Sequence, residues 1–347
     1  TFLKKRDIAS ILSVCLRISR LRITGLHFYS VDVSKLLESE LRSADRLHGS
    51  LRGALGYLFV KRLKEAKIHP KRAISWFEGQ AIDRGWSLGF GNFMPEVDTL
   101  GYQGFVGGPM SSKVNNSESV ALAVPKCVGV MGKGFSENAQ EFIGDRTHIE
   151  VSPAFRFSQA APVPLDWSSQ FSGDPTPVLI ALPGDLGLSE RFLSAVEEAF
   201  QHPNSLAAWV KPHPRIAYED LNLSDGGNIR WRNMSDHSMS DLLSKAKLLM
   251  CPELTSVGFE SVLAGRPAII FSSTFSENDL MPAGLPKGLW RLATTPSEIL
   301  IAYKEFNDAY GRGVTYDGLS REARESCLAP VNPASVTKFL FGKHPGH

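Results

Sequence analysis

Two basic side chains follow an apolar run in the second half of the sequence. The run 205–210 is followed by Lys211 and His213, and a proline stands on each side of the histidine. Proline fixes its own φ and restricts the residue before it, so the ammonium group and the imidazole point in set directions. A cation pair held in this way at the end of a strand is suited to binding an anion such as phosphate.

A second anion-binding pattern lies about 40 residues later. Thr255 and Ser256, followed by Gly258, stand at the start of the predicted helix 256–265. The first N–H groups of a helix are unpaired, and the two hydroxyls add further donors. A simple N-cap role for either hydroxyl is the alternative. Glu260, one turn further on, is either favoured by the helix dipole or accepts hydrogen bonds from ribose hydroxyls.

Alternating strand and helix patterns place these residues in one sheet. The predicted strands of the second half are 177–182, 205–210, 228–233, 248–253 and 267–272, the last closing the set. The predicted helices between and after them are 189–200, 238–247, 256–265 and 296–306. This alternation is typical of parallel sheets, in which ligands bind beyond the carboxyl ends of the strands. Because both anion-binding groups lie at that edge, we expect them to hold one phosphate.

The first half shows the same alternation less clearly. Its predicted strands are 72–78, 98–104, 126–132 and 147–153, and its predicted helices are 49–66 and 136–144. The stretch 158–177 is rich in Pro, Ser and Gly, as linkers are. We therefore expect an α/β protein with two doubly wound domains, 1–165 and 166–330. The segment 331–347 is expected to be a C-terminal helix and tail that cross back to the first domain.

Composition excludes several classes of protein. The 347 residues carry a formal charge of +2, which gives no sign of a nucleic-acid binder. The four cysteines are scattered without a CxxC pair, so reduced, buried thiols of a cytoplasmic protein are expected. No strand end carries a DxD pattern, so neither a metal nor a cofactor is expected. No apolar run reaches the length of a membrane-spanning helix.

The first predicted helix has a distinctive charge pattern. Its apolar segment IASILSVCL is bracketed by Lys4, Lys5, Arg6, Arg17, Arg20 and Arg22. Such a segment packs on its own domain or lies on an anionic membrane surface. The second alternative would place the protein peripherally on the cytoplasmic face of the inner membrane.

Two motifs give the sequence a resemblance to a known family. KPHP at 211–214 and TSVGFESVLAGRPAIIF at 255–271 resemble the donor-binding half of GT-B glycosyltransferases, enzymes with two Rossmann-like domains facing a cleft. The pair is most similar to bacterial enzymes of capsule and lipopolysaccharide synthesis, namely the polysialyltransferase and Kdo-transferase groups that use CMP-sugars. The segment WFEGQAIDRGW…DTLGYQGF (76–105) looks like part of their acceptor domain.

The resemblance implies roles for individual residues. Lys211 and His213 would contact the donor phosphate, and Glu260 would hold the ribose. The complete set of implied donor-binding residues is Lys211, His213, Thr255, Ser256, Gly258, Glu260 and Gly184. Only one serine follows Thr255, where a Ser-Ser pair would indicate CMP, so CDP-glycerol-type and UDP-sugar enzymes remain alternatives.

The proton-transfer residue is less defined. Asp185, in PGDLG, and Glu78, at the end of the run 72–78, are the candidate catalytic carboxylates, with His213 stabilising charge on the leaving phosphate. A turn role for Asp185 and a helix N-terminal role for Glu78 are the alternatives, and Asp83 is a third candidate. His237 and His148 are expected at the surface or in the core.

These expectations describe a metal-independent glycosyltransferase. It would move a sugar from a nucleotide-sugar donor, such as CMP-Kdo or a CMP-sialic-acid-like sugar, to a glycan or glycolipid acceptor in surface polysaccharide synthesis. A UDP-sugar 2-epimerase, a CDP-glycerol-type transferase and a non-catalytic module of a larger synthase are the alternatives.

Overall fold

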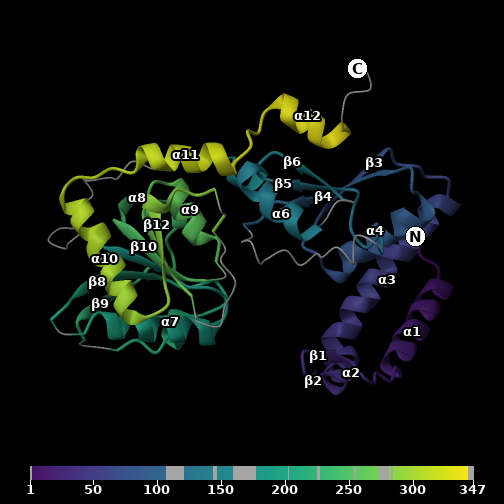
Figure 1. Cartoon of the computed structure of the whole chain (residues 1–347), viewed down its shortest axis with the longest axis horizontal. Helices are drawn as coiled ribbons and strands as arrows, with labels where there is room; N and C mark the ends of the chain where they lie inside the picture. Colours follow the sequence, from purple (N-terminus) through teal and green to yellow (C-terminus); the bar gives the residue numbers. More distant parts are fainter. Residues whose placement is uncertain are drawn as a thin grey trace.

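The protein contains two parallel sheets in separate lobes (Figure 1). The computed structural model describes residues 2–106, 121–143, 147–158, 177–201, 203–224, 227–253, 255–272, 281–282 and 284–342. The first sheet has the order β3-β4-β5-β6, and the second has the order β12-β11-β10-β7-β8-β9. The predicted α/β class is confirmed. The predicted domain boundary at residue 165 lies outside the described residues.

The strands follow the apolar runs of the sequence. The first sheet consists of β3 (Arg72–Trp76), β4 (Asp98–Gln103), β5 (Cys127–Val130) and β6 (His148–Val151). The second consists of β7 (Val178–Ala181), β8 (Leu206–Lys211), β9 (Ile229–Asn233), β10 (Leu248–Pro252), β11 (Ala268–Phe271) and β12 (Trp290–Ala293). Every residue of β7 and β10 is buried, as expected for central strands covered by helices on both faces.

One strand prediction is wrong. The run 267–272 does not close the second sheet, because β12 pairs with β11 at its edge. The four residues of β12 include the exposed Leu292 and the partly buried Arg291. A short edge strand needs no continuous apolar run, so its sequence signal is weak.

Helices cover both faces of the second sheet and return the chain to the first. They are α7 (Leu186–Ala199), α8 (Met239–Lys245), α9 (Val257–Leu263), α10 (Pro296–Gly311) and α11 (Asp317–Cys327). After α11, the amide of Ala329 donates to the carbonyl of Met131, and its own carbonyl accepts from Ala154. The last helix, α12 (Pro333–Phe341), places Phe339 against the rings of Tyr102 and Phe155 on the first domain.

An arm of helices projects from the first domain (Figure 1). It comprises α1 (Lys5–Ser19), the hairpin of β1 (His27–Phe28) and β2 (Val31–Asp32), α2 (Ser34–Arg42) and α3 (Ala44–Glu65). The first domain also contains α4 (Ala81–Phe93) and α6 (Ser136–Ile143). Within the described residues, no helix has both the length and the hydropathy needed to cross a membrane.

Two glycines join the arm to the rest of the domain. Gly53 of α3 and Gly85 of α4 face each other so closely that a Cβ on Gly85 would lie 1.9 Å from the carbonyl oxygen of Gly53. Only residues without a side chain allow two helix backbones to approach to this distance. This close crossing fixes the position of α3 on α4. The position of α1 follows, because α1 packs on α3.

A buried ion pair holds α1 on α3. Arg62 of α3 donates two hydrogen bonds to the Asp7 carboxylate, and both side chains are 5% exposed. The Arg62 guanidinium lowers the pKa of Asp7 to about 2. Because the pKa is lowered in the folded arm, the pair stabilises α1 above the unfolded pKa of about 3.9, and this contribution is lost as the pH falls toward 2.

We predict that Asp7→Asn loosens α1 at neutral pH. The variant removes the carboxylate through which Arg62 holds α1, while Glu65 of α3 itself remains a partner of Arg62. Backbone hydrogen exchange in α1 should therefore be several-fold faster than in the wild type. The difference should shrink between pH 4 and pH 2, after correction for the intrinsic exchange rate. Asp308→Asn, at an exposed position on α10, is the matched control. Equal exchange at pH 7 would contradict the structural role of the pair.

Candidate functional site

The carboxyl edges of the two sheets contact each other. The short helix η2 (Lys133–Phe135) follows β5, η3 (Phe155–Phe157) follows β6, and α9 follows β10. Phe259 of α9 is fully buried, and its ring packs edge-on against Phe135 at 5.8 Å and Phe157 at 5.4 Å between centroids. The edges at which parallel sheets bind ligands therefore meet at one interdomain contact.

A polar group lies next to this aromatic contact. Arg156 of the first domain donates from Nη2 to Ser256 Oγ, over 2.8 Å, and to Glu260 Oε1, over 3.2 Å. Ser256 Oγ in turn donates to Glu260 Oε1 over 3.0 Å. The structure thus brings together two of the predicted donor-binding residues, and Arg156 joins them from the other domain.

The hydroxyls at the start of α9 are not equivalent. Ser256 has helical backbone angles and makes no capping hydrogen bond, so its hydroxyl is directed to the polar group instead. Thr255 Oγ1 accepts from the amide of Val257 over 3.4 Å, and Gly258 is buried against Ile270. Since α9 has only seven residues, side chains rather than a helix dipole carry the anion-binding capacity here.

The basic residues after β8 form a second group. The imidazole of His213 packs over Gly184, where an added Cβ would lie 3.1 Å from its Nδ1. Nδ1 accepts from the amide of Arg215 over 3.2 Å, so in a neutral ring Nε2 carries the proton. Lys211 Nζ donates to the carbonyl of Ser235. Only β7 lies between β8 and β10, which puts the ends of these two strands about 10 Å apart.

The two candidate carboxylates have local partners. Asp185 is exposed and caps α7, because its Oδ1 accepts from the amide of Leu188 over 2.8 Å. The Glu78 carboxylate accepts from the indole of Trp76 over 2.6 Å and from the side-chain Nε2 of Gln80 over 2.7 Å. β3 is three strands from β6, so the end of β3, which Glu78 follows, lies about 14 Å along the edge from the end of β6.

Asp83 is a structural carboxylate. It is 7% exposed and accepts hydrogen bonds from the amides of Glu78 and Gln80 at the start of α4. Burial raises its pKa above the ordinary value. Its hydrogen bonds fix the turn that carries Glu78.

The two other histidines considered in the sequence are both exposed. His237 follows β9 at the carboxyl edge of the second sheet, two residues beyond Ser235. His148 is exposed at the start of β6, where its ring and the ligand atoms of Cys127 and Glu150 lie within 4.8 Å of one another. Arg72 already lies 3.3 Å from the Glu150 carboxylate. This cluster is at the amino ends of β5 and β6, at the opposite edge of the sheet from the interdomain contact.

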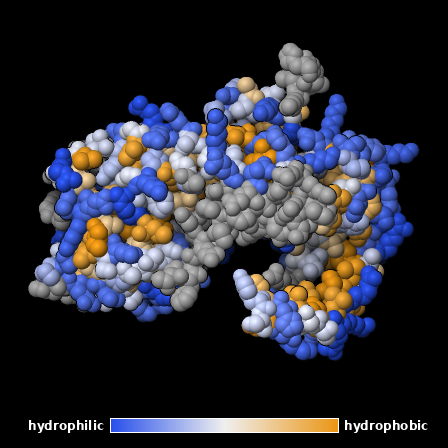
Figure 2. Space-filling model, in the orientation of Figure 1, coloured by the Kyte–Doolittle hydropathy of each residue, from blue (hydrophilic) through white to orange (hydrophobic). Residues whose placement is uncertain are grey.

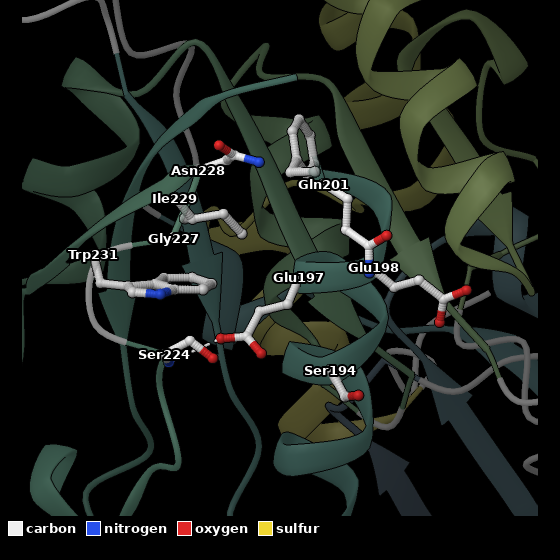
Figure 3. A pocket seen from close by; sticks show the side chains of 10 residues that line it. Ser194, Glu197, Glu198, Gln201, Ser224, Gly227, Asn228, Ile229 and Trp231 are labelled. Carbon is white, nitrogen blue, oxygen red and sulfur yellow. Dashed lines mark hydrogen bonds between the residues drawn. The ribbon is translucent and has the colours of Figure 1, made fainter. Parts of the chain in front are cut away.

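The cavity in Figure 3 is also at an amino edge. It has a volume of about 490 Å³ and lies between the end of α7 and the start of β9. Glu197 accepts there from the amide of Ser224 over 3.0 Å, with Trp231 beside them. The cavity therefore lies at the opposite edge of the second sheet from the carboxyl strand ends that carry the predicted site.

Comparisons with known proteins identify the architecture. No family model and no curated protein matches the sequence. Among solved structures, CalG4, the calicheamicin glycosyltransferase, is similar at a TM-score of 0.52 and 13% identity, covering 92% of this chain and 84% of that one. This chain has the GT-B fold.

Two further structures share this fold. Sucrose-phosphate synthase from Thermosynechococcus elongatus has a TM-score of 0.51 at 14% identity, covering 84% of this chain and 77% of that one. UDP-N-acetylglucosamine 2-epimerase from Rickettsia bellii has a TM-score of 0.51 at 13% identity, covering 86% of this chain and 78% of that one. The neighbours therefore include glycosyl-transferring enzymes and an epimerase, and at these identities they establish the fold alone.

Sequence reasoning missed Arg156. The residue follows β6 in the stretch PAFRF, so it occupies a strand end of the kind that drew attention to Lys211 and His213. Applying the strand-end rule to every strand of the first half would have included it. Its partners, which lie 100 and 104 positions away, follow only from how the domains pack.

We predict that Phe259→Ala destabilises the protein by about 3–5 kcal/mol, because it leaves a cavity between the two domains. Chemical denaturation measures the loss of unfolding free energy. Phe341→Ala, at a side chain that is 72% exposed, is the control and should change stability by less than about 0.5 kcal/mol. A similarly small effect of Phe259→Ala would show that the interdomain contact is not formed in solution.

Proposed function

We propose that the protein is a glycosyltransferase that transfers a sugar from a nucleotide-sugar donor to a glycan acceptor. One observation carries the proposal. Lys211 and His213 lie on the same carboxyl edge as the Ser256–Glu260 pair, and this edge contacts the other domain of a GT-B fold. Cations and hydroxyls gathered at such an edge suit a nucleotide's phosphate and ribose.

The donor phosphate would bind between the two groups of residues. His213 Nε2–H, the Lys211 ammonium and the Thr255 hydroxyl would donate to the phosphate as it leaves, with Gly184 and Gly258 allowing close approach. Each donor that acts on the developing charge contributes typically about 2.7–4 kcal/mol. Stabilisation by protein cations would require no metal and no cofactor.

The ribose would bind at Glu260. Its carboxylate already accepts from Ser256 and Arg156, and ribose hydroxyls are donors of the same kind. Donor binding would exchange the Arg156 hydrogen bond for a ribose hydrogen bond. The guanidinium would then be available to a second anionic group of the donor.

The finer assignment rests on the sequence resemblance. The KPHP motif and the α9 segment favour a CMP-linked sugar, such as CMP-Kdo or a CMP-sialic-acid-like sugar, and an acceptor in surface polysaccharide synthesis. Asp185 and Glu78 are the proposed acid-base carboxylates. Asp185 is the nearer of the two to the phosphate site, because it follows β7, the strand between β8 and β10.

Calorimetric titration with CMP, UDP and CDP tests the proposal. We expect CMP to bind most tightly, because the motifs around His213 and Ser256 favour CMP. Preferential binding of UDP would replace the CMP assignment with a UDP-sugar transferase or an epimerase. The epimerase alternative additionally requires turnover of a UDP-sugar without an acceptor. Binding of none of the three nucleotides would contradict the proposed function and indicate a non-catalytic module.

His213→Ala is expected to lower the transfer rate by roughly 100–1000-fold without unfolding the protein, because it removes one donor to the leaving phosphate. The assay is transfer from the nucleotide-sugar selected by the titration. His69→Ala, at an exposed histidine that precedes β3 and so lies at the opposite edge of the first sheet, is the matched control and should retain full activity. Near-wild-type transfer by His213→Ala would refute the role of the imidazole.

Gly184→Ala tests the position of the same imidazole. The added methyl would lie 3.1 Å from His213 Nδ1, so the ring must shift. We expect about tenfold weaker nucleotide binding in calorimetry and a nearly unchanged free energy of unfolding. Gly187→Ala, whose Cβ would lie 3.6 Å from Asp185 Oδ1, is the control. Equal affinities of the two variants would show that the ring position does not matter.

A further inference from the structure

The arm has an unusually apolar surface. Of the twenty-four large apolar side chains that are exposed among the described residues, eleven lie between residues 2 and 37. They are Phe2, Ile8, Leu12, Leu16, Leu21, Leu26, Phe28, Tyr29, Val31, Leu36 and Leu37. Figure 2 shows apolar side chains gathered over the arm, beside the hollow that separates it from the other lobe. A concentration of this kind marks an interaction surface.

α1 carries apolar side chains on two faces. Ile11 is 1% exposed and belongs to the face that packs on α3. Ile8, Leu12 and Leu16 are spaced by four residues, so they form one line along the helix, and they are 50%, 53% and 58% exposed. A helix that only packs on its own domain needs the first face and not the second.

The hairpin and α2 extend this surface. Phe28 and Tyr29 at the hairpin turn are 67% and 91% exposed, and their rings lie 4.9 Å apart. Val31 and Leu36, in β2 and α2, are 61% and 65% exposed. The exposed ring of Tyr29 has a polar end, which suits the interface between lipid headgroups and acyl chains, and Phe28 adds apolar area beside it.

Basic residues surround the apolar ones. Residues 2–43 contain eight Lys and Arg against four Asp and Glu, a net charge of +4 in a chain of net +2, so the remainder is net negative. Glu38 is 4% exposed and lies within 4.0 Å of three cations, namely Arg22, Lys35 and Arg42. The net charge of these four side chains is therefore positive. Positive charge around an apolar surface complements a bilayer that contains anionic lipids.

The surface is formed before any partner binds. Arg42 donates to the carbonyls of Ser19 and Leu21 over 3.1 Å and 3.3 Å, which ties α2 to the end of α1. The amide of Ile23 donates to Glu38 over 2.8 Å. Together with the Asp7–Arg62 pair, these bonds hold α1, with its exposed line of Ile8, Leu12 and Leu16, and the hairpin in place. Docking therefore costs little conformational entropy.

We propose that the arm docks the protein on an anionic lipid bilayer. α1 lies in the interface with Ile8, Leu12 and Leu16 among the acyl chains, the hairpin rings lie at headgroup depth, and Lys5, Arg17 and Arg20 contact lipid phosphates. The docking itself does not depend on the sugar chemistry. One further point rests on the proposed function. The arm belongs to the domain expected to bind the acceptor, so docking would bring that domain close to a lipid-linked acceptor.

Flotation of the full chain with lipid vesicles tests the docking. Wild type should bind vesicles of phosphatidylglycerol and phosphatidylcholine, bind pure phosphatidylcholine at least tenfold more weakly, and lose most binding in high salt. Leu12→Glu with Leu16→Glu should weaken binding at least tenfold, and Arg17→Ala with Arg20→Ala should cost about fivefold for each charge. Ile301→Glu, at a 66% exposed position on α10, is the matched control.

Three results would overturn the proposal. The first is that wild type fails to float with anionic vesicles, and the second is that the double Glu variant floats as well as wild type. The third is a stable dimer, seen by sedimentation without lipid, that Leu12→Glu with Leu16→Glu dissociates, because the apolar line would then be covered by a second copy. Unchanged nucleotide binding by the double Glu variant separates a failure here from a failure of the proposed function.

Discussion

The contact of Phe259 with Phe135 and Phe157 determines where the two carboxyl edges meet. Phe259 lies on α9 between Ser256 and Glu260, so burying its ring also fixes the polar side chains on either side of it. The same contact places Arg156, the neighbour of Phe157, within hydrogen-bond distance of both. Apolar packing thus provides the position, and the polar residues beside it provide the chemistry.

Arg156 joins the two domains through hydrogen bonds to Ser256 and Glu260. Glu260 is partly buried at 29% exposure, and a partly buried carboxylate is costly without a partner. The Arg156 guanidinium and the Ser256 hydroxyl both donate to this carboxylate. Because Arg156 and Glu260 come from different domains, the proposed exchange of Arg156 for a ribose hydroxyl would link nucleotide binding to how tightly the domains are held together.

Sequence patterns predicted which residues follow the strands. Contacts between segments far apart in the sequence could not be predicted in this way. Lys211, His213 and Ser256 could be found because each follows a buried apolar run, and parallel strands place such residues on one edge. The edge strand β12 lacks such a run, and Asp185 has the same local pattern whether it caps a helix or moves a proton. The contact of Glu260 with Arg156 could not be predicted, because it depends on how the two domains pack. The sequence shows the apolar residues Ile8, Leu12 and Leu16 of α1. That they are exposed follows only from how α1 packs on α3.

A crystal structure of the protein with its preferred nucleotide bound tests the central claim most directly. The account predicts the phosphate within hydrogen-bond distance of His213 Nε2 and the Thr255–Ser256 corner. The ribose should then bind Glu260, and Arg156 should be displaced from that carboxylate. A nucleotide bound at the opposite edge, for example in the cavity beside Glu197 and Trp231, would contradict it.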